Sequence, residues 1–89
     1  MIHSNTTIIN KLGLHARASA KLSKLAGSFP CEVWITKGER RDNSKSIMGV
    51  MMLAAGIDTE VTVDTDGERE QEAMQAILAL IADRFGESE

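Results

Sequence analysis

The chain has 89 residues, of which 43% are hydrophobic, so the sequence predicts a single small globular domain with one modest core. The formal net charge of −3 and the pI near 5.3 argue against a nucleic-acid-binding protein, which presents a basic face. No apolar run approaches the roughly 20 residues that cross a bilayer, and no signal-peptide pattern opens the chain, so we expect a cytoplasmic protein without membrane insertion.

The N-terminal part predicts a strand, a turn and a helix. The alternation from Ile2 to Ile9 is typical of a strand, and the residues from Asn10 to Gly13 are turn-like. From Ala16 onward, apolar residues recur at helical spacing until Gly27, which ends the helix.

Two strands and a second helix follow. Cys31 to Thr36 alternate between apolar and polar residues, and this alternation turns Trp34 away from the helix layer. A turn leads into Arg40 to Asn43, a short edge strand protected by charge. Ser46 stands at an N-cap position before the apolar helix from Ile47 to Leu53.

The C-terminal part predicts a strand from Glu60 to Thr65 and a long helix after Gly67. Acidic residues near the start of this helix and Arg84 near its end suit the helix dipole. Its buried stripe consists of Ala73, Met74, Ile77, Leu78, Ile81 and Phe85. We expect the last three residues, 87–89, to form a frayed tail.

This order of elements, βαββαβα, predicts an α+β fold. Amphipathic helices and short strands that alternate in this way form two layers, with the helices on one face of an antiparallel sheet.

His15 is the candidate reactive residue. It stands at the start of a predicted helix, where backbone N–H groups without a helical partner bind anions. Imidazole is nucleophilic and largely neutral near pH 7, and Arg17 adds a fork of donors that suits phosphate oxygens. The pattern predicts a phosphoryl-accepting site. Taken alone, a histidine near a helix start is more often an ordinary surface residue.

The helix after Ser46 is apolar at nearly every position, and so small a domain cannot bury its whole circumference. We expect some of Ile47, Met48, Met51 and Met52 to stay exposed as an adaptable contact surface. The alternative is a wholly buried core helix.

Two motifs together resemble one known family. They are Gly13-Leu14-His15-Ala16-Arg17 and Lys45-Ser46-Ile47-Met48-Gly49-Val50, and at this separation they resemble the two signatures of HPr, the histidine-containing phosphocarriers of the bacterial phosphotransferase system. The resemblance covers essentially the whole chain. One departure is that Ala18 and Ser19 stand where the family commonly has Pro-Ala, from which we expect altered transfer rates rather than lost function.

The resemblance implies an open-faced sandwich, a four-stranded antiparallel sheet with three helices on one face. It also implies a carrier and not an enzyme. His15 would accept a phosphoryl group, on Nδ1 in this family, from enzyme I, which is charged by phosphoenolpyruvate, and would pass the group to enzyme IIA components. Arg17 would stabilise the phosphoryl group, and Ser46 would be phosphorylated by HPr kinase/phosphorylase. We expect a monomer with the partner-binding residues Leu14, Ala16, Ile47, Met48 and Met51.

We expect neither a cofactor nor a metal. Cys31 is the single cysteine, and with only His3 and His15 beside it no metal-ligand spacing exists. Cys31 is therefore predicted to be a small core residue.

Other functions stay open on the sequence. One alternative is a regulatory binding module that no longer transfers phosphate and acts by contacting other proteins. The intact His15 and Arg17 weigh against it, because such a module would be free to lose them. A ferredoxin-like nucleic-acid or metal-binding domain would need a basic face or metal ligands that this chain lacks. Sugar uptake and a signalling or nitrogen-linked branch also remain alternatives, although the Ser46 motif favours the main branch.

Overall fold

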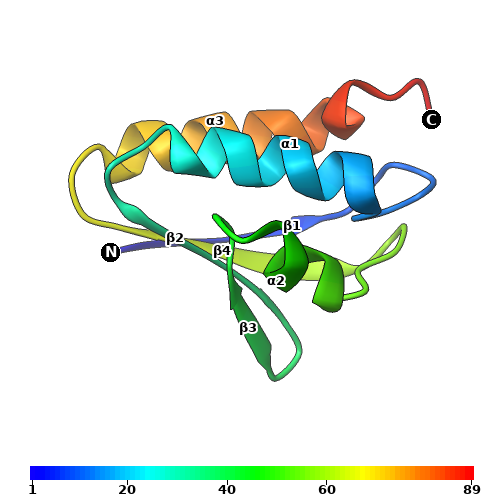
Figure 1. Cartoon of the computed structure of the whole chain (residues 1–89), viewed down its shortest axis with the longest axis horizontal. Coiled ribbons are helices and arrows are strands. Elements are labelled where there is room, and N and C mark those ends of the chain that lie inside the picture. Colours follow the sequence, from blue (N-terminus) through cyan, green and yellow to red (C-terminus); the bar gives the residue numbers. More distant parts are fainter.

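The structure is a computed structural model that describes residues 1–89. Its elements follow the predicted order (Figure 1). They are β1 (Ile2–Thr7), α1 (Ala16–Gly27), β2 (Glu32–Lys37), β3 (Arg40–Asn43), α2 (Ile47–Met52), β4 (Glu60–Asp66), α3 (Glu70–Ala82) and the 3-10 turn η1 (Arg84–Gly86). The strand bounds lie within two residues of the predicted ones, which is the usual scatter of such boundaries.

The strands form one antiparallel sheet in the order β1-β4-β2-β3. Figure 1 shows α1 and α3 side by side over one face of this sheet, with α2 near the N-terminal half of α1. Helix α1 packs against both other helices. The predicted α+β fold with an open sheet face is therefore confirmed. None of the helices is both long and apolar enough to cross a membrane.

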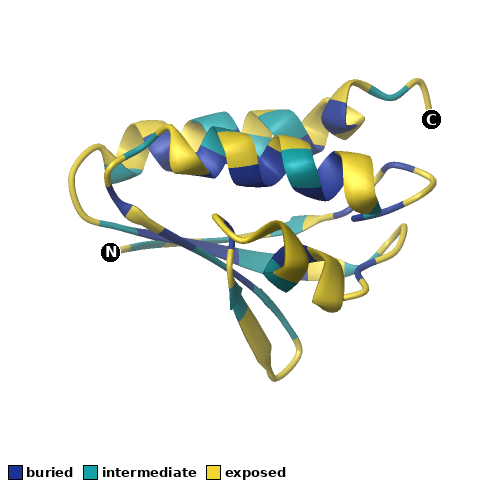
Figure 2. Ribbon diagram, in the orientation of Figure 1, coloured by how far each residue is buried: buried dark blue, intermediate teal, exposed yellow.

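The core lies between the sheet and the helices, where Figure 2 shows the buried residues gathered. Val33 and Ile35 of β2 and Val61 and Val63 of β4 point inward at every second position, as their alternation predicted. Cys31 is 2% exposed and is a core residue, which confirms the prediction. Buried helical residues cover these strands; they are Ala18, Leu22, Ala26, Val50, Ala73, Met74, Ile77 and Ile81.

Helix α3 ends earlier than its apolar stripe suggested. It stops at Ala82, and Arg84 and Phe85 adopt left-handed backbone angles, with φ of 55° and 54°. Arg84, which we expected near the end of this helix, lies two residues beyond it and opens η1. Phe85 is fully buried, but it reaches the core from η1, because the left-handed residues turn the chain back onto the domain. Leu78 is only half-buried.

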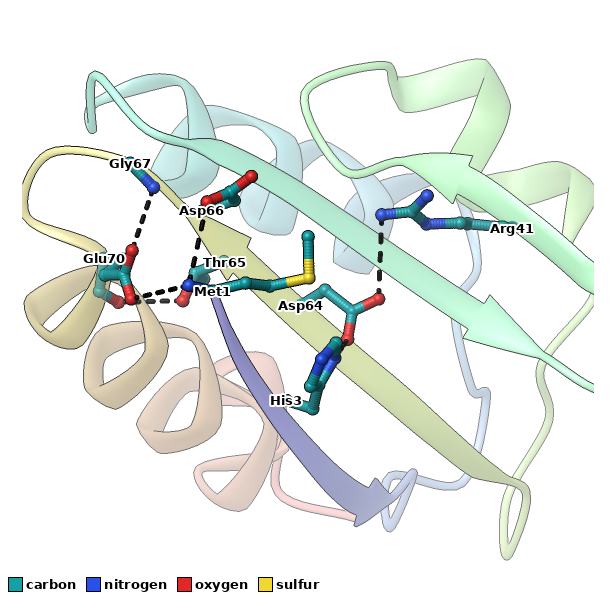
Figure 3. A network of polar contacts seen from close by, with 8 residues as sticks. All are labelled: Met1, His3, Arg41, Asp64, Thr65, Asp66, Gly67 and Glu70. Carbon is teal, nitrogen blue, oxygen red and sulfur yellow. Dashed lines mark hydrogen bonds and ion pairs between the residues drawn. The ribbon is translucent and has the colours of Figure 1, made fainter.

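The open sheet face carries a row of polar side chains from neighbouring strands (Figure 3). Nδ1 of His3 lies 2.5 Å from Oδ1 of Asp64, its cross-strand partner, and Nη2 of Arg41 lies 3.8 Å from the other carboxylate oxygen. The guanidinium of Arg41 also lies 4.4 Å from the centroid of the Trp34 ring. Trp34 is thus half-buried on the open face, as predicted, and its contacts tie β2 to β3.

Candidate functional site

His15 is the N-cap residue of α1, as predicted. Its backbone is extended, with φ −72° and ψ 179°, and its side chain makes no capping hydrogen bond. The first amides of α1 therefore keep no partner and can bind an anion. Arg17 lies in the first turn of the same helix and is exposed, so its guanidinium can reach an anion bound there.

The approach to His15 depends on Gly13. This residue has a φ of +63°, and an added Cβ would lie 2.4 Å from the carbonyl oxygen of Ala55. The neighbouring amide of Leu14 donates to that same oxygen at 2.9 Å. Because the loop packs so closely on the segment after α2, only glycine fits at this position.

Two buried polar residues hold the loop in place. The Nδ2 group of Asn10, a fully buried residue, donates to the carbonyl oxygen of Gly13 at 2.8 Å. The hydroxyl of Ser19 donates to the carbonyl of Leu14 at 3.0 Å, and the Ser19 amide donates to the carbonyl of His15 at 2.8 Å. His15 therefore follows a loop that is fixed from both sides.

The C-terminal tail, residues 87–89, lies against this loop and is not frayed, so that prediction was wrong. Oε2 of Glu87 lies 2.5 Å from Nε2 of His15, and Oε1 accepts from Nδ2 of Asn10 at 3.1 Å. The amide of Lys11 donates to the carbonyl of Glu89 at 3.0 Å. Figure 1 shows the chain ending beside the start of α1. The tail is held because η1 and the buried Phe85 direct it there.

The charge of Glu87 is stabilised by these contacts. Hydrogen bonds from His15 and, secondly, from Asn10 hold the pKa of the Glu87 carboxyl below its usual value, and the positive charge of Lys21 acts in the same direction. Sequence reasoning missed both Asn10 and Glu87. The only local signal was a turn-type asparagine three residues before Gly13.

His15 opens onto a surface cleft of about 670 Å³. Lys11, Leu12, Ala16 and Arg17 form one side of this cleft, and the C-terminal tail forms the other. Lys11 and Arg17 line this cleft together with the carboxylates of Glu87 and Glu89, and Nζ of Lys11 lies 3.4 Å from Oε2 of Glu89. Arg17 and the free helix amides are therefore the groups that can bind a dianionic phosphoryl group.

Ser46 is the N-cap residue of α2, as predicted. Its Oγ accepts a hydrogen bond from the amide of Gly49 at 3.1 Å. Ser46 itself is exposed, so its hydroxyl can also be reached from solvent. This cap satisfies one of the orphan amides of a short helix.

The apolar side of α2 is largely uncovered. Only Val50 of this helix is buried, whereas Ile47, Met48 and Met51 are 45%, 67% and 37% exposed. The alternative of a wholly buried helix is therefore wrong. We call Ile47, Met48, Met51 and Met52 the α2 surface.

Of the two partner-binding residues predicted in the first motif, Leu14 and Ala16, one is buried and one is exposed. Ala16 is exposed, but Leu14 is only 5% exposed and packs in the core, so its prediction as a contact residue was wrong. The loop that fixes His15 turns the neighbouring Leu14 side chain inward. Leu12, which the sequence analysis did not single out, is 66% exposed beside His15.

No group of three or more His, Cys, Asp and Glu side chains is placed to hold a metal ion.

Comparison with known proteins identifies the family. The family model described as "PTS HPr component phosphorylation site" matches residues 2–83. The chain is 65% identical to phosphocarrier protein HPr of Cupriavidus necator over 89 residues, which is 100% of both chains. It is similar to the crystal structure of HPr-C-His from Thermoanaerobacter tengcongensis, with a TM-score of 0.96, 37% identity and 100% of both chains covered. A crystal structure of an HPr dimer from the same organism matches with a TM-score of 0.79, 38% identity and coverage of 98% of this chain and 100% of that chain.

The matches extend over nearly the whole chain, and the fold agrees with that of the HPr structures. The chain therefore belongs to the HPr family and is a phosphocarrier of the bacterial phosphotransferase system, not an enzyme.

Proposed function

We propose that His15 accepts a phosphoryl group from phosphorylated enzyme I and passes it to enzyme IIA components. The observation that carries the proposal is the position of His15 at an N-cap with free amides, in an open cleft beside Arg17. A neutral imidazole nitrogen can attack phosphorus there, while the helix amides and the guanidinium stabilise the added negative charge.

A carrier also has to release the group. Interaction of a charge with a helix terminus contributes about 0.3–1 kcal/mol at exposed sites, which helps transfer without trapping the product. Arg17 is exposed, so it can move with the phosphoryl group as a partner approaches. Whether the phosphoryl group is taken up or released then depends on which partner, enzyme I or enzyme IIA, is bound.

We assign docking of these partners to Ala16 and to the α2 surface. Exposed methionines adapt to different partner shapes, which suits a protein that meets several partners in turn. Leu12 extends the same apolar rim beside the cleft. Its exposure makes it a further contact residue in this proposal.

Ser46 is the proposed regulatory site, phosphorylated by an HPr kinase/phosphorylase. A phosphate on the cap would lie at the helix N-terminus, where the fold tolerates negative charge. It would also place about −1.5 to −2 charges beside Met48, where docking would suffer from repulsion and desolvation. The Ser46 motif supports a role in the main, sugar-linked branch.

We further propose that the protein acts as a cytoplasmic monomer. The edge strand β3 carries charged residues, which discourage pairing with a second copy. Light scattering at several concentrations would test this, since the HPr dimer described above shows that another member has been seen in a dimeric form.

The central test is incubation with enzyme I and phosphoenolpyruvate, followed by mapping of any acid-labile phosphate. We expect the label on His15, its loss in His15→Ala, and its persistence in the matched control His3→Ala. Circular dichroism should show that both variants fold, because His3 is exposed and His15 is only partly buried. Label that stays in His15→Ala and disappears in His3→Ala would refute the assignment.

A further inference from the structure

Glu87 makes a hydrogen bond that determines where the proton of His15 lies. A carboxylate oxygen only accepts hydrogen bonds, so the Nε2 atom that lies 2.5 Å from Oε2 has to carry the proton. A neutral imidazole has one N–H group, and Nδ1 is then left unprotonated with a free lone pair. The contacts of the His15 ring with the rest of the chain are made by Nε2, and Nδ1 makes no hydrogen bond within the chain.

Asn10 fixes the carboxylate in this position. Its Nδ2 group faces two acceptors, Oε1 of Glu87 at 3.1 Å and the carbonyl of Gly13 at 2.8 Å. A flipped amide would place its oxygen against both acceptors, so the contacts themselves determine which atom is nitrogen. Asn10 is fully buried and cannot turn away. Glu87 is therefore held between a rigid donor and the imidazole ring.

We propose that Glu87 is a positioning residue for phosphoryl transfer, holding His15 in the Nε2–H tautomer and so presenting Nδ1 as the nucleophile. The inference rests on the proposed function, in which His15 accepts the group on Nδ1. It adds a residue that lies 72 positions away in the sequence and outside both motifs.

The transfer balances with this tautomer. The lone pair of Nδ1 forms the new P–N bond, while the bond from phosphorus to the donor atom of enzyme I breaks and returns its electron pair to that atom. No proton has to leave His15, because Nε2 keeps its own. The phosphorylated ring gains positive charge, and the carboxylate of Glu87 faces that charge from the side opposite to the reaction.

The decisive variant is Glu87→Gln. An amide offers one oxygen where the carboxylate offered two, yet both Asn10 and His15 need an acceptor. Since Asn10 cannot turn, the amide oxygen has to face Asn10 and the NH2 group has to face Nε2. Nε2 must then accept, and the proton moves to Nδ1. This substitution therefore favours the tautomer that cannot react.

The measurement is ¹⁵N NMR of the histidine ring in the unphosphorylated protein, at about pH 9, where an ordinary imidazole with a pKa of about 6.5 is neutral. We expect Nε2–H in the unmodified protein and Nδ1–H in Glu87→Gln. Phosphorylation by enzyme I should be at least about tenfold slower in this variant, because only a minor tautomer can react. The matched control Glu89→Gln removes the same charge two residues away and should keep Nε2–H.

Glu87→Ala separates positioning from anchoring of the tail. It removes the acceptor without offering a donor to Nε2, so its transfer rate should lie between those of the unmodified protein and Glu87→Gln. Equal tautomers and equal rates in the two variants would mean that Glu87 only anchors the tail, and would overturn the inference. So would Nδ1–H in the unmodified protein.

The NMR result does not depend on where phosphate is attached. If the label maps to a residue other than His15, the proposed function fails while the tautomer measurement still stands. If the label maps to His15 but Glu87→Gln leaves the tautomer of His15 unchanged, the inference about Glu87 fails and the proposed function stands.

Discussion

Two helix starts in this protein are built in opposite ways. At the start of α2, the N-cap Ser46 satisfies the amide of Gly49 with its own hydroxyl, over three residues. At the start of α1, the N-cap His15 makes no capping bond, and its ring is held instead by Glu87 from the far end of the chain. At α2 the N-cap side chain thus satisfies one helix amide, whereas at α1 no side chain caps an amide.

In the proposed function, this difference would give the phosphorylation sites at His15 and Ser46 different consequences. Free amides beside a nucleophile favour rapid arrival and departure of a phosphoryl group. A hydroxyl that already caps a helix places any added phosphate next to the α2 surface, where it changes docking rather than chemistry.

Ser46→Asp should reduce the affinity for enzyme I by about tenfold or more, because a charge beside the α2 surface costs on the order of 1–3 kcal/mol in desolvation and repulsion. The melting temperature should hold or rise slightly, since acidic residues suit helix N-termini. Met48→Ala is the control for lost contact area without charge. Its defect should depend far less on salt than that of Ser46→Asp. Unchanged affinity in both variants would place the partner surface elsewhere.

Arg17→Ala should slow phosphotransfer several-fold in both directions, because a charge-assisted hydrogen bond to the phosphoryl group is worth about 1.5–3 kcal/mol at most and this site is exposed. The free energy of unfolding should change by no more than about 0.5 kcal/mol, as is usual at surface positions. Rapid-quench kinetics and thermal unfolding measure the two quantities. If Arg17→Ala transfers phosphate as fast as the unmodified protein, the free amides of α1 are enough to stabilise the phosphoryl group without Arg17.

Removing each N-cap side chain compares the two helix starts directly. Ser46→Ala should lower the free energy of unfolding by about 1 kcal/mol, because the amide of Gly49 loses its acceptor. His15→Ala should cost less, since that side chain caps nothing. Urea unfolding of both variants measures the difference. An equal or larger loss in His15→Ala would mean that contact with the tail contributes more to stability than we infer.

Acid should release the tail while leaving α2 capped. Because the pKa of Glu87 is lowered in the folded protein, its stabilising contribution is present above the usual carboxyl value of about 4.3 and is lost as the pH falls through the lowered value. The protection factor of the Lys11 amide, which is bonded to the tail, should therefore fall in that range, whereas that of the Gly49 amide should not. Glu87→Gln should abolish the pH response of Lys11, and a persisting response would point to another carboxylate.

Local patterns in the sequence determined most of the fold. Apolar periodicity predicted the order βαββαβα, and the alternation in β2 and β4 predicted which side chains form the core. The two N-cap positions were also predictable, Ser46 from its residue type and His15 from the turn that precedes the helical periodicity. These features rest on interactions between residues that are close in the chain.

Only the tertiary structure decided the inward turn of Leu14, the end of α3 at Ala82 and the docking of Glu87 on His15. Each depends on a contact that no window of sequence contains: the carbonyl of Ala55 that receives the loop, the core site that receives Phe85, and the buried Asn10 that holds a carboxylate 77 positions away. Local patterns thus identified His15 as the candidate nucleophile and predicted the helix that begins beside it. The state of that nucleophile was decided by folding, because a hydrogen bond between the two ends of the chain forms only when packing has brought them together.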